Sequence, residues 1–431
     1  MEVKMTTPAK NRLCSIIQFS SKLLALLRFL AVFALPTSLM ANAGDLDPTF
    51  GTNGIVTNAN SVADAAALQS DGKIVVAGSI PNSQNFQQGG LLRYTSNGVL
   101  DSSFGTGGKV LIAAGSSEAG TAFAVAIQPD GKILTAAPAS VYLTVFRFNT
   151  NGTSDNTFGT NGSVLITAAG ILPTSGGIAV QSDGKIVIVS RDIVARLLAN
   201  GQFDSTFGSG GVAPTVGSNL GGNSVAILSN GQILIGSGNV TSLYTAANGS
   251  LVTTFGINGQ TAGFPFDGVG GFVVTTDTTT NRIKIVTAGS LITSPSLTFG
   301  QTTSGFLLVR YTSNGTIDNS FGTHGGIATA FPGNLFSQAF AVAAQTNGDI
   351  VAVGQTALTD VNEIPGPSNF GLARYLPNGQ IDTTFGNGGF VSTAFGSSEA
   401  FANTVLIQTD GKIVVSGNSN SGATVARYLG N

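Results

Sequence analysis

The sequence predicts an all-β fold, a seven-bladed β-propeller of four-stranded antiparallel blades, and three observations support this prediction. The motif D-x-x-F-G occurs seven times, once in degenerate form, and a second motif built on an Asp-Gly or Asn-Gly turn recurs between its copies. The first and last segments of the chain read as two parts of one repeat. Composition agrees, since 59 glycines, 9% charged residues and no tryptophan are typical of many short strands joined by tight turns.

Each repeat is predicted to form one sheet of about four strands. The stretch "AFAVAIQPDGKILTA" (122–136) is two apolar runs around Asp-Gly, which favours a hairpin of buried strands because the glycine supplies a positive φ. The stretch "LLRYTSNGVLD" (91–101) repeats this pattern with Asn-Gly. The motif phenylalanines are Phe50, Phe104, Phe158, Phe207, Phe255, Phe321 and Phe385.

The two ends of the chain predict that the repeats close into a ring. The chain ends on "RYLGN" (427–431), and "GDLD" (44–47) continues it into R-Y-x-x-N-G-x-L-D with no residue missing or added. An open array would need polar caps and would expose sheet edges, whereas a closed ring avoids both. The N-terminal strand is therefore expected to complete the last blade.

An arginine and an aspartate recur eight residues apart. The pairs are Arg93 and Asp101, Arg147 and Asp155, Arg196 and Asp204, Arg310 and Asp318, Arg374 and Asp382 and, across the closed ring, Arg427 and Asp47. One unit has Leu243 in place of the arginine and Val252 in place of the aspartate. Because both residues are lost together, we expect each pair to contact within a blade and to have a structural role rather than a ligand-binding one.

Residues 1–43 read as a secretory signal peptide. Cationic residues precede the apolar stretch "LLALLRFLAVFAL" (23–35), and Ala41-Asn42-Ala43 satisfies the small-residue cleavage rule. A membrane anchor is the alternative, but Arg28 interrupts a run shorter than the roughly 20 residues needed to span a bilayer. Residues 44–431 are then a single propeller domain that is secreted, periplasmic or on the cell surface, with no membrane span after cleavage.

Cleavage would also remove the only cysteine and change the net charge of the chain. The only cysteine, Cys14, would be lost, and with it any disulfide or thiolate site. Five of the 19 basic residues and one of the 21 acidic residues lie in this segment. The remaining chain would have 14 basic and 20 acidic residues, and therefore a net charge of −6. Nucleic-acid binding depends on clustered lysine and arginine, so this composition argues against a nucleic-acid partner.

The repeat motifs resemble the delta-60 repeat, a propeller-type repeat of exported bacterial proteins that is similar in pattern to NHL repeats. The strings L-D-x-x-F-G-x-x-G-x-V, Q-x-D-G-K-I-V-V-A-G and L-x-R-Y-x-x-N-G carry the resemblance, which covers residues 44–431. The chain departs from the pattern at 243–256, and at "DTTTNRIKI" (277–285), where a longer turn replaces Asp-Gly. The resemblance implies a β-propeller and export, and it implies no particular activity.

Three carboxylates are candidates for a binding site. Glu118 and Glu399 occur in the same phrase, "GSSEA" (115–119 and 396–400), in connectors that lead into innermost strands, and Asp64 has a nearby position in the first repeat. Repeats seven, one and two are neighbours in a closed ring, so the three carboxylates could face one end of the central channel. Such an oxygen-only set suits Ca²⁺. The alternative is that all three are solvated loop charges.

The expected binding surface is a loop-rich face. Long and varied loops at 79–90, 290–305 and 355–371 are expected on the same side as the connectors with Glu118 and Glu399, and binding residues tend to lie on loops held by a rigid scaffold. The sequence thus predicts a non-enzymatic scaffold for a protein or glycan ligand. The alternative is a lactonase- or lyase-like propeller enzyme with a channel metal. The single histidine, His324, counts against it because "FGTHGG" reads as a left-handed turn.

Overall fold

The computed structural model describes residues 41–114, 117–139, 142–167, 175–190, 193–215, 224–262, 266–277, 280, 282–291, 305–334, 336–358, 367–396 and 399–431. Residues 42–431 form one compact unit. Residues 1–40 of the expected signal peptide lie outside the described ranges, so that assignment stays a prediction. Among the described residues, no helix has the length and apolar character needed to cross a bilayer.

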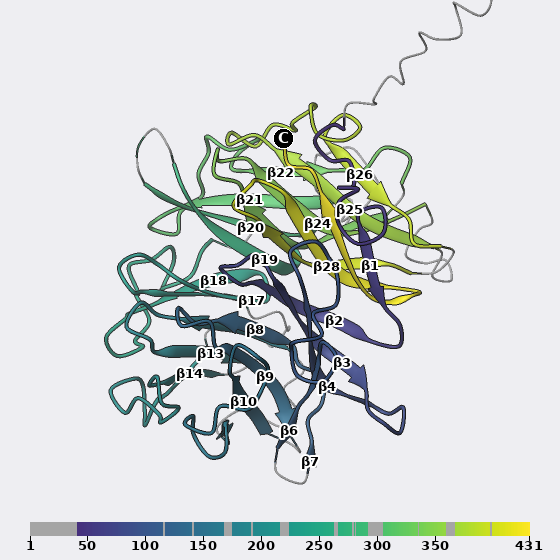
Figure 1. The fold of residues 1–431 in the computed structure, drawn as a ribbon. Coiled ribbons are helices and arrows are strands. Elements are labelled where there is room, and N and C mark those ends of the chain that lie inside the picture. The colour runs from purple at the N-terminus through teal and green to yellow at the C-terminus, as the bar shows by residue number, and fades with distance from the viewer. Residues whose placement is uncertain are drawn as a thin grey trace, which may run out of the picture. The chain divides into compact units, whose positions relative to one another are not determined.

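Seven antiparallel sheets follow one another in chain order, which confirms the predicted all-β propeller (Figure 1). Blade 1 contains β2 (Val62–Leu68), β3 (Ile74–Pro81), β4 (Gln87–Tyr94) and β5 (Lys109–Leu111). Blade 2 contains β8 (Ala124–Ile127), β9 (Ile133–Ala139), β10 (Tyr142–Phe148) and β11 (Ser163–Ile166). Blade 3 contains β12 (Gly176–Val180), β13 (Ile186–Ser190), β14 (Ile193–Leu197) and β15 (Val212–Pro214).

The later blades repeat this order, and the last one takes its outer strand from the N-terminus. Blade 4 contains β16 (Ser224–Ile227), β17 (Ile233–Ser237) and β18 (Val240–Tyr244). Blade 5 contains β19 (Phe266–Thr276), β20 (Ile283–Leu291), β21 (Phe306–Thr312) and β22 (Gly326–Thr329). Blade 6 contains β23 (Phe336–Ala344), β24 (Ile350–Ala357), β25 (Ser368–Tyr375) and β26 (Phe390–Thr393). Blade 7 contains β27 (Phe401–Ile407), β28 (Ile413–Ser419), β29 (Gly422–Tyr428) and β1 (Ile55–Asn58).

Two details depart from a uniform ring of four-stranded blades. Blade 4 has three strands in the described residues, and a single bridge from Ser242 to Gln260 stands where its fourth strand would pair. A two-stranded ribbon, β6 (Ala113–Ala114) with β7 (Ser117–Glu118), is inserted between blades 1 and 2. The connector that holds Glu118 is therefore partly a strand and not simply a loop.

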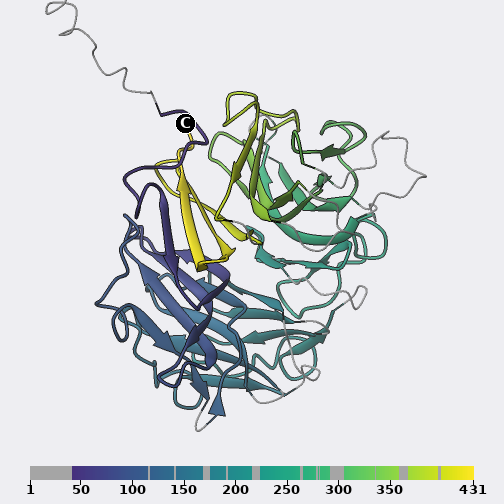
Figure 2. The same cartoon turned by 90° about the vertical axis from the view of Figure 1, so that its right-hand side faces the viewer.

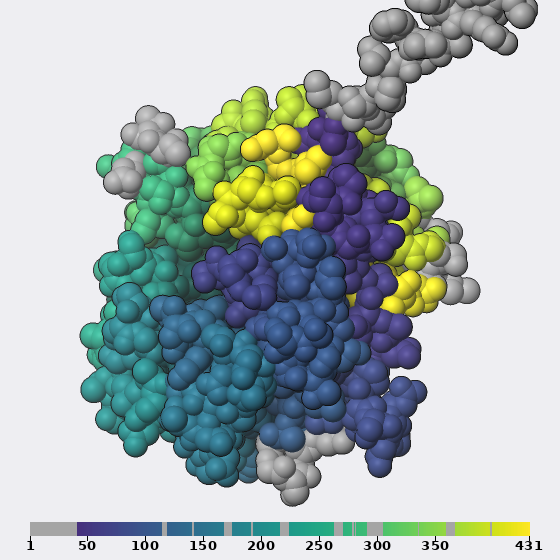
Figure 3. All heavy atoms as spheres, in the orientation of Figure 1, coloured from purple at the N-terminus to yellow at the C-terminus, as the bar shows by residue number. Residues whose placement is uncertain are grey.

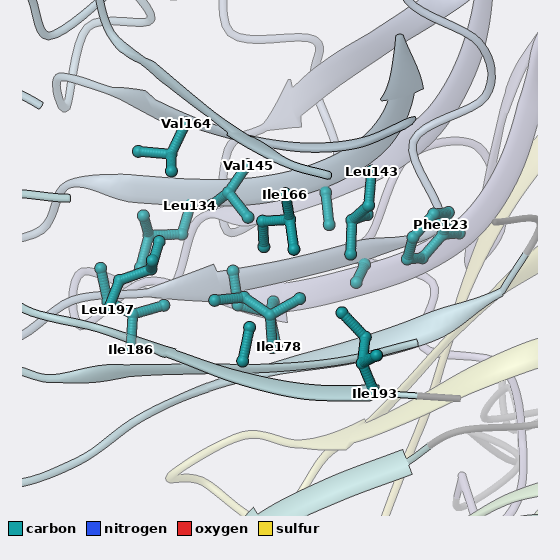
Figure 4. Close-up of a cluster of buried hydrophobic side chains, with 14 of the residues drawn as sticks. Phe123, Leu134, Leu143, Val145, Val164, Ile166, Ile178, Ile186, Ile193 and Leu197 are labelled. Carbon is teal, nitrogen blue, oxygen red and sulfur yellow. The ribbon is translucent and has the colours of Figure 1, made fainter. Parts of the chain in front are cut away.

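Apolar side chains fill the spaces between the blades. Seven buried clusters occur in the described residues, one at each junction between successive blades, including the junction of blade 7 with blade 1. Figure 4 shows the cluster between blades 2 and 3, where Leu134 and Val145 face Ile186 and Leu197. Every motif phenylalanine is 0–2% exposed, and truncating such a residue to alanine typically costs about 3–5 kcal/mol.

The ring is closed by the N-terminal segment, as the chain ends predicted. Strand β1 pairs antiparallel with β29, in a register that places Ile55 opposite Ala426, and innermost strand β27 contacts β2 of blade 1. Figures 2 and 3 show this purple segment lying against the yellow C-terminal strands. One sheet is thus assembled from both ends of the chain.

The turn that joins the two ends is split but otherwise regular. In blade 1, Gly98 N–H donates to Thr95 O, and the N–H of Gly51 donates to Asn97 O. In blade 7, Gly44 N–H donates to Leu429 O at 2.8 Å, and the N–H of Gly386 donates to Ala43 O at 2.7 Å. The equivalent of Asn97 is therefore the buried Ala43, whereas joining the ends predicted Asn431 at this position. Gly44 has a φ of +92°, and a Cβ there would lie 2.6 Å from Gly386 N, so only glycine fits.

The six motif arginines lie buried between blades. Each arginine Nε is 2.7–2.9 Å from Oδ2 of its aspartate, and each guanidinium carbon is 4.4–4.7 Å from the centroid of a motif phenylalanine ring. Nη1 donates to a backbone carbonyl in the turn of the next blade, at Thr150, Ala199, Ala246, Pro377, Gly430 and Ser96 in order from Arg93 to Arg427. The arginine thus connects two blades as well as pairing within one.

The junction between blades 4 and 5 lacks this arrangement. Leu243 is buried there, and Val252 packs against the same cluster, which also contains Phe255. The backbone bond from Gly256 N–H to Asn314 O, at 2.7 Å, is retained. An apolar contact therefore replaces the whole guanidinium network at one of seven junctions.

Candidate functional site

The central channel is the candidate site. It has a volume of about 690 Å³ and is lined by residues on or next to the innermost strands of all seven blades: β2, β8, β12, β16, β19, β23 and β27. Most of its lining is apolar or backbone. The polar exceptions are Asp64, Ser175, Ser224, Asn403 and Thr404.

β-Bulges bring particular side chains into the channel. The pairing of β2 with β3 skips Asp64, that of β23 with β24 skips Phe340, and that of β27 with β28 skips Asn403. A bulge re-aims a side chain by adding one unpaired residue to a strand. All three bulged residues line the channel, together with Gly270 at the corresponding bulge of β19.

These residues occupy one position of the repeat. Asp64, Phe340 and Asn403 each lie eight residues ahead of the glycine in their Asp-Gly or Asn-Gly turn, and so do Phe123 and Gly176, which also line the channel. Going round the ring from blade 6 to blade 2, this position reads Phe340, Asn403, Asp64, Phe123. One side of the channel mouth thus carries a carboxylate and an amide between two aromatic rings.

The backbone beside Asp64 is fixed by the neighbouring blade. Ala63 N–H donates to Asn418 Oδ1 at 2.8 Å, and Ala63 O accepts from Asn403 Nδ2 at 2.8 Å. The carboxylate of Asp64 has no hydrogen bond or ion pair with any residue in the described part of the chain. Burial raises the pKa of its carboxyl to about 6, because desolvation disfavours the charged form when no cation compensates.

The mouth of the channel near Asp64 opens on the loop-rich face. Val62, at the start of β2, pairs with Ser79 near the end of β3, and the same register in the other blades places the ends of β9 and β24 at this end. Ala400 N–H donates to Ser368 Oγ at 2.9 Å, which ties the Glu399 connector to the start of β25. Three large apolar side chains are exposed there: Phe86 (64%), Tyr142 (38%) and Leu358 (64%).

The three predicted carboxylates lie in different settings. Asp64 lies within β2 and lines the channel. Glu399 is exposed and is not among the residues that line the channel. Glu118 lies in β7, and its side chain is outside the described residues. Within the described ranges, no three His, Cys, Asp or Glu side chains gather closely enough to hold a metal ion.

His324 occupies the turn that its sequence context predicts. Its φ is +55°, and the residues at the same place in sister repeats, Asn53, Asn161 and Gly210, have φ values of +51° to +63°. The side chain is exposed, in the turn ahead of β22 at the outer edge of blade 5. It does not line the channel.

Five of the repeats match a known family model. The model is described as "Domain of unknown function (DUF5122) beta-propeller", and it matches residues 69–104, 128–158, 181–207, 284–321 and 345–385. These five segments are similar to this propeller family. Among curated proteins, none matches the chain.

Solved structures that resemble this propeller share its fold at low sequence identity. A catalytically inactive virginiamycin B lyase from Staphylococcus aureus, with quinupristin, matches with a TM-score of 0.52 and 11% identity over 87% of this chain and 97% of that one. A chain described as the extracellular domain of a one component system from B. thetaiotaomicron matches with a TM-score of 0.45 and 14% identity over 87% of this chain. The propeller spans 40% of the length of that second chain.

The raised pKa of Asp64 predicts a pH-dependent effect of removing its charge. The folded pKa of about 6 exceeds the unfolded value of about 3.9, so ionising Asp64 disfavours the folded state above pH 6 and has no effect below pH 4. Asp64→Asn should therefore raise the free energy of unfolding by about 1–2 kcal/mol at pH 8, less than the full shift because water reaches the group. Urea unfolding at pH 8 and pH 4 measures this difference.

The exposed Glu399 offers a matched control. Glu399→Gln should change stability by no more than about 0.5 kcal/mol at either pH, as is usual for surface substitutions. An equal gain from Asp64→Asn at pH 4 and pH 8 would show that its carboxylate is not the destabilising group.

Proposed function

We propose that this protein is an exported, non-enzymatic binding propeller whose ligand enters the central channel from the loop-rich face. One observation supports the proposal: the carboxylate of Asp64 is partly buried in a channel of about 690 Å³ and has no hydrogen-bond or ion-pair partner in the described residues. An uncompensated charge in a partly buried position is unfavourable. Ionisable groups with perturbed pKa values are concentrated at functional sites. The protein or glycan expected from the sequence would contact this mouth and the loops around it.

An enzymatic function lacks an observation in its favour. The likeness to the lyase, at 11% identity, shows the fold alone. That lyase was made catalytically inactive by replacing one histidine with alanine, whereas the only histidine here, His324, lies in an exposed turn at the edge of a blade. The binding function is therefore the better supported of the two.

Attaching a bulky polymer to one face at a time tests which face of the propeller binds the ligand. Residues 44–431 contain no cysteine, so Phe86→Cys on the loop-rich face and Val99→Cys on the opposite face can each be coupled to a long polyethylene glycol. The two native side chains are 64% and 58% exposed, which makes the positions a matched pair. Binding is measured to a panel of purified glycans and cell-envelope polymers. We expect polymer at position 86 to reduce binding and polymer at position 99 to leave it unchanged; the reverse result would refute the proposal.

A further inference from the structure

We infer that the channel takes an organic ammonium ion, with its charge at Asp64 and its apolar part against Phe340. This inference rests on the proposed function and specifies the chemistry of the ligand. It follows from the charge, the hydrogen-bonding groups and the aromatic side chains at the channel mouth.

The charge at the mouth is negative and uncompensated. Asp64 is the only ionisable residue among the described residues that line the channel. The lysines after the Asp-Gly turns, Lys73, Lys132, Lys185 and Lys412, pair with aspartates at or beside those turns, at the other end of the blades. The motif arginines are already paired between blades. A cation supplied by a ligand is therefore the missing partner of Asp64.

The hydrogen-bonding groups next to Asp64 are acceptors. Asn403 uses its Nδ2 to donate to Ala63 O, and its Oδ1 makes no further bond within the described residues. A carboxylate and an amide oxygen on adjacent blades suit a group that brings only donors, as an ammonium does. A neutral hydroxyl could also donate to these oxygens, but it would bring no positive charge to compensate Asp64.

The aromatic side chains suit the rest of such a ligand. Phe340 precedes Asp64 by two blades at the same repeat position. Phe123, one blade after Asp64, is 9% exposed and packs mainly in the core between blades 2 and 3. Phe340 packs edge-to-face on Phe401, with ring centroids 6.3 Å apart, and this contact helps to hold its ring. Aromatic faces attract cations and pack against apolar groups. At the same position Gly176 and Gly270 present no side chain, so the recognition groups lie on one side of the mouth.

Two probes of similar shape test the charge requirement. Isothermal titration calorimetry at pH 8 compares benzylammonium with benzyl alcohol on the mature protein. We expect benzylammonium to bind at least about fivefold more tightly, as a partly desolvated ion pair and an aromatic contact would give. Asp64→Asn should abolish this preference. Phe340→Leu should weaken the binding of both probes, and Glu399→Gln should leave the affinity for each probe unchanged. Melting temperatures of the variants verify that each is folded.

The outcomes separate this inference from the proposed function. Equal binding of both probes that is unaffected by Asp64→Asn would overturn the ammonium inference and leave the channel as a binding site. No binding of either probe up to tens of millimolar would also overturn it, and the face-blocking experiment would then decide the proposed function by itself. A preference for benzylammonium that survives Asp64→Asn would place the cation elsewhere and refute the assignment of Asp64.

Discussion

Replacing Asp47 with alanine should lower the free energy of unfolding by about 3–5 kcal/mol, because it leaves the buried guanidinium of Arg427 without its counter-charge. The two residues are 2% and 5% exposed, and Nε lies 2.9 Å from Oδ2. Asp47 also accepts bonds from the N–H and hydroxyl of Thr49. Chemical denaturation of the mature protein at pH 7 measures the loss.

A double-mutant cycle separates the contact from the effects of truncation. Combining Asp47→Val with Arg427→Leu copies the apolar pair Val252 and Leu243 of blade 4. The double variant should lose less free energy of unfolding than Asp47→Val alone, because an apolar pair can replace a buried ion pair. Asp71→Ala, which breaks the exposed pair with Lys73, should cost no more than about 1 kcal/mol. Additivity of the two single substitutions within about 0.5 kcal/mol would show that the residues do not interact.

The same pair should make stability depend on pH. Burial alone would raise the pKa of Asp47, but hydrogen bonds from Thr49 and the charges of Arg427 and Lys412 lower it below its ordinary value. A carboxyl with a depressed folded pKa stabilises the fold above its unfolded pKa, about 3.9, and loses this contribution as the pH falls through the folded pKa. The difference between wild type and Asp47→Ala should therefore shrink below about pH 4.

Most of the fold could be predicted from the sequence because each strand boundary carries a local signal. The Asp-Gly and Asn-Gly turns mark the hairpins, and the complementary ends indicate how β1 completes the last blade. The position of Ala43 could not be predicted, since Asn431 matches the repeat string at the split turn and Ala43 does not. In the structure Ala43 takes this position because its carbonyl oxygen accepts a hydrogen bond from Gly386 N–H.

The site was less predictable because it depends on backbone irregularities. The fixed spacing indicated an Arg–Asp contact within each blade, but the bond from each arginine to the next blade joins segments about 50–70 residues apart and has no sequence signature of its own. Asp64 reaches the channel through a β-bulge, and a bulge shifts which face a residue occupies. Comparing the six residues that lie eight positions ahead of a turn glycine could have found the aromatic pair, because Phe123 and Phe340 share that position.

Deleting residues 44–58 from the mature protein should prevent stable folding of the propeller at 25 °C. The deletion removes β1, leaves β29 as an open sheet edge, takes Phe50 out of the core between blades 7 and 1, and leaves Arg427 without Asp47. Losing a buried phenylalanine and leaving a buried charge unpaired each cost about 3–5 kcal/mol. Their sum is comparable with the whole net stability of a typical domain, about 5–15 kcal/mol. Thermal melting and binding of a hydrophobic dye detect the loss.

Rescue in trans shows whether ring closure, rather than general truncation damage, explains that loss. A synthetic peptide of residues 44–58 should restore a cooperative melting transition that strengthens as the peptide concentration rises, because it binds only the folded chain. The same peptide with Asp47→Ala and Phe50→Ala should fail, since it can form strand β1 but lacks both the counter-charge and the buried ring. A truncated chain that melts within a few degrees of the wild type without peptide would mean that blades 1–6 and β27–β29 hold together unaided, and that the N-terminal strand does not fasten the ring.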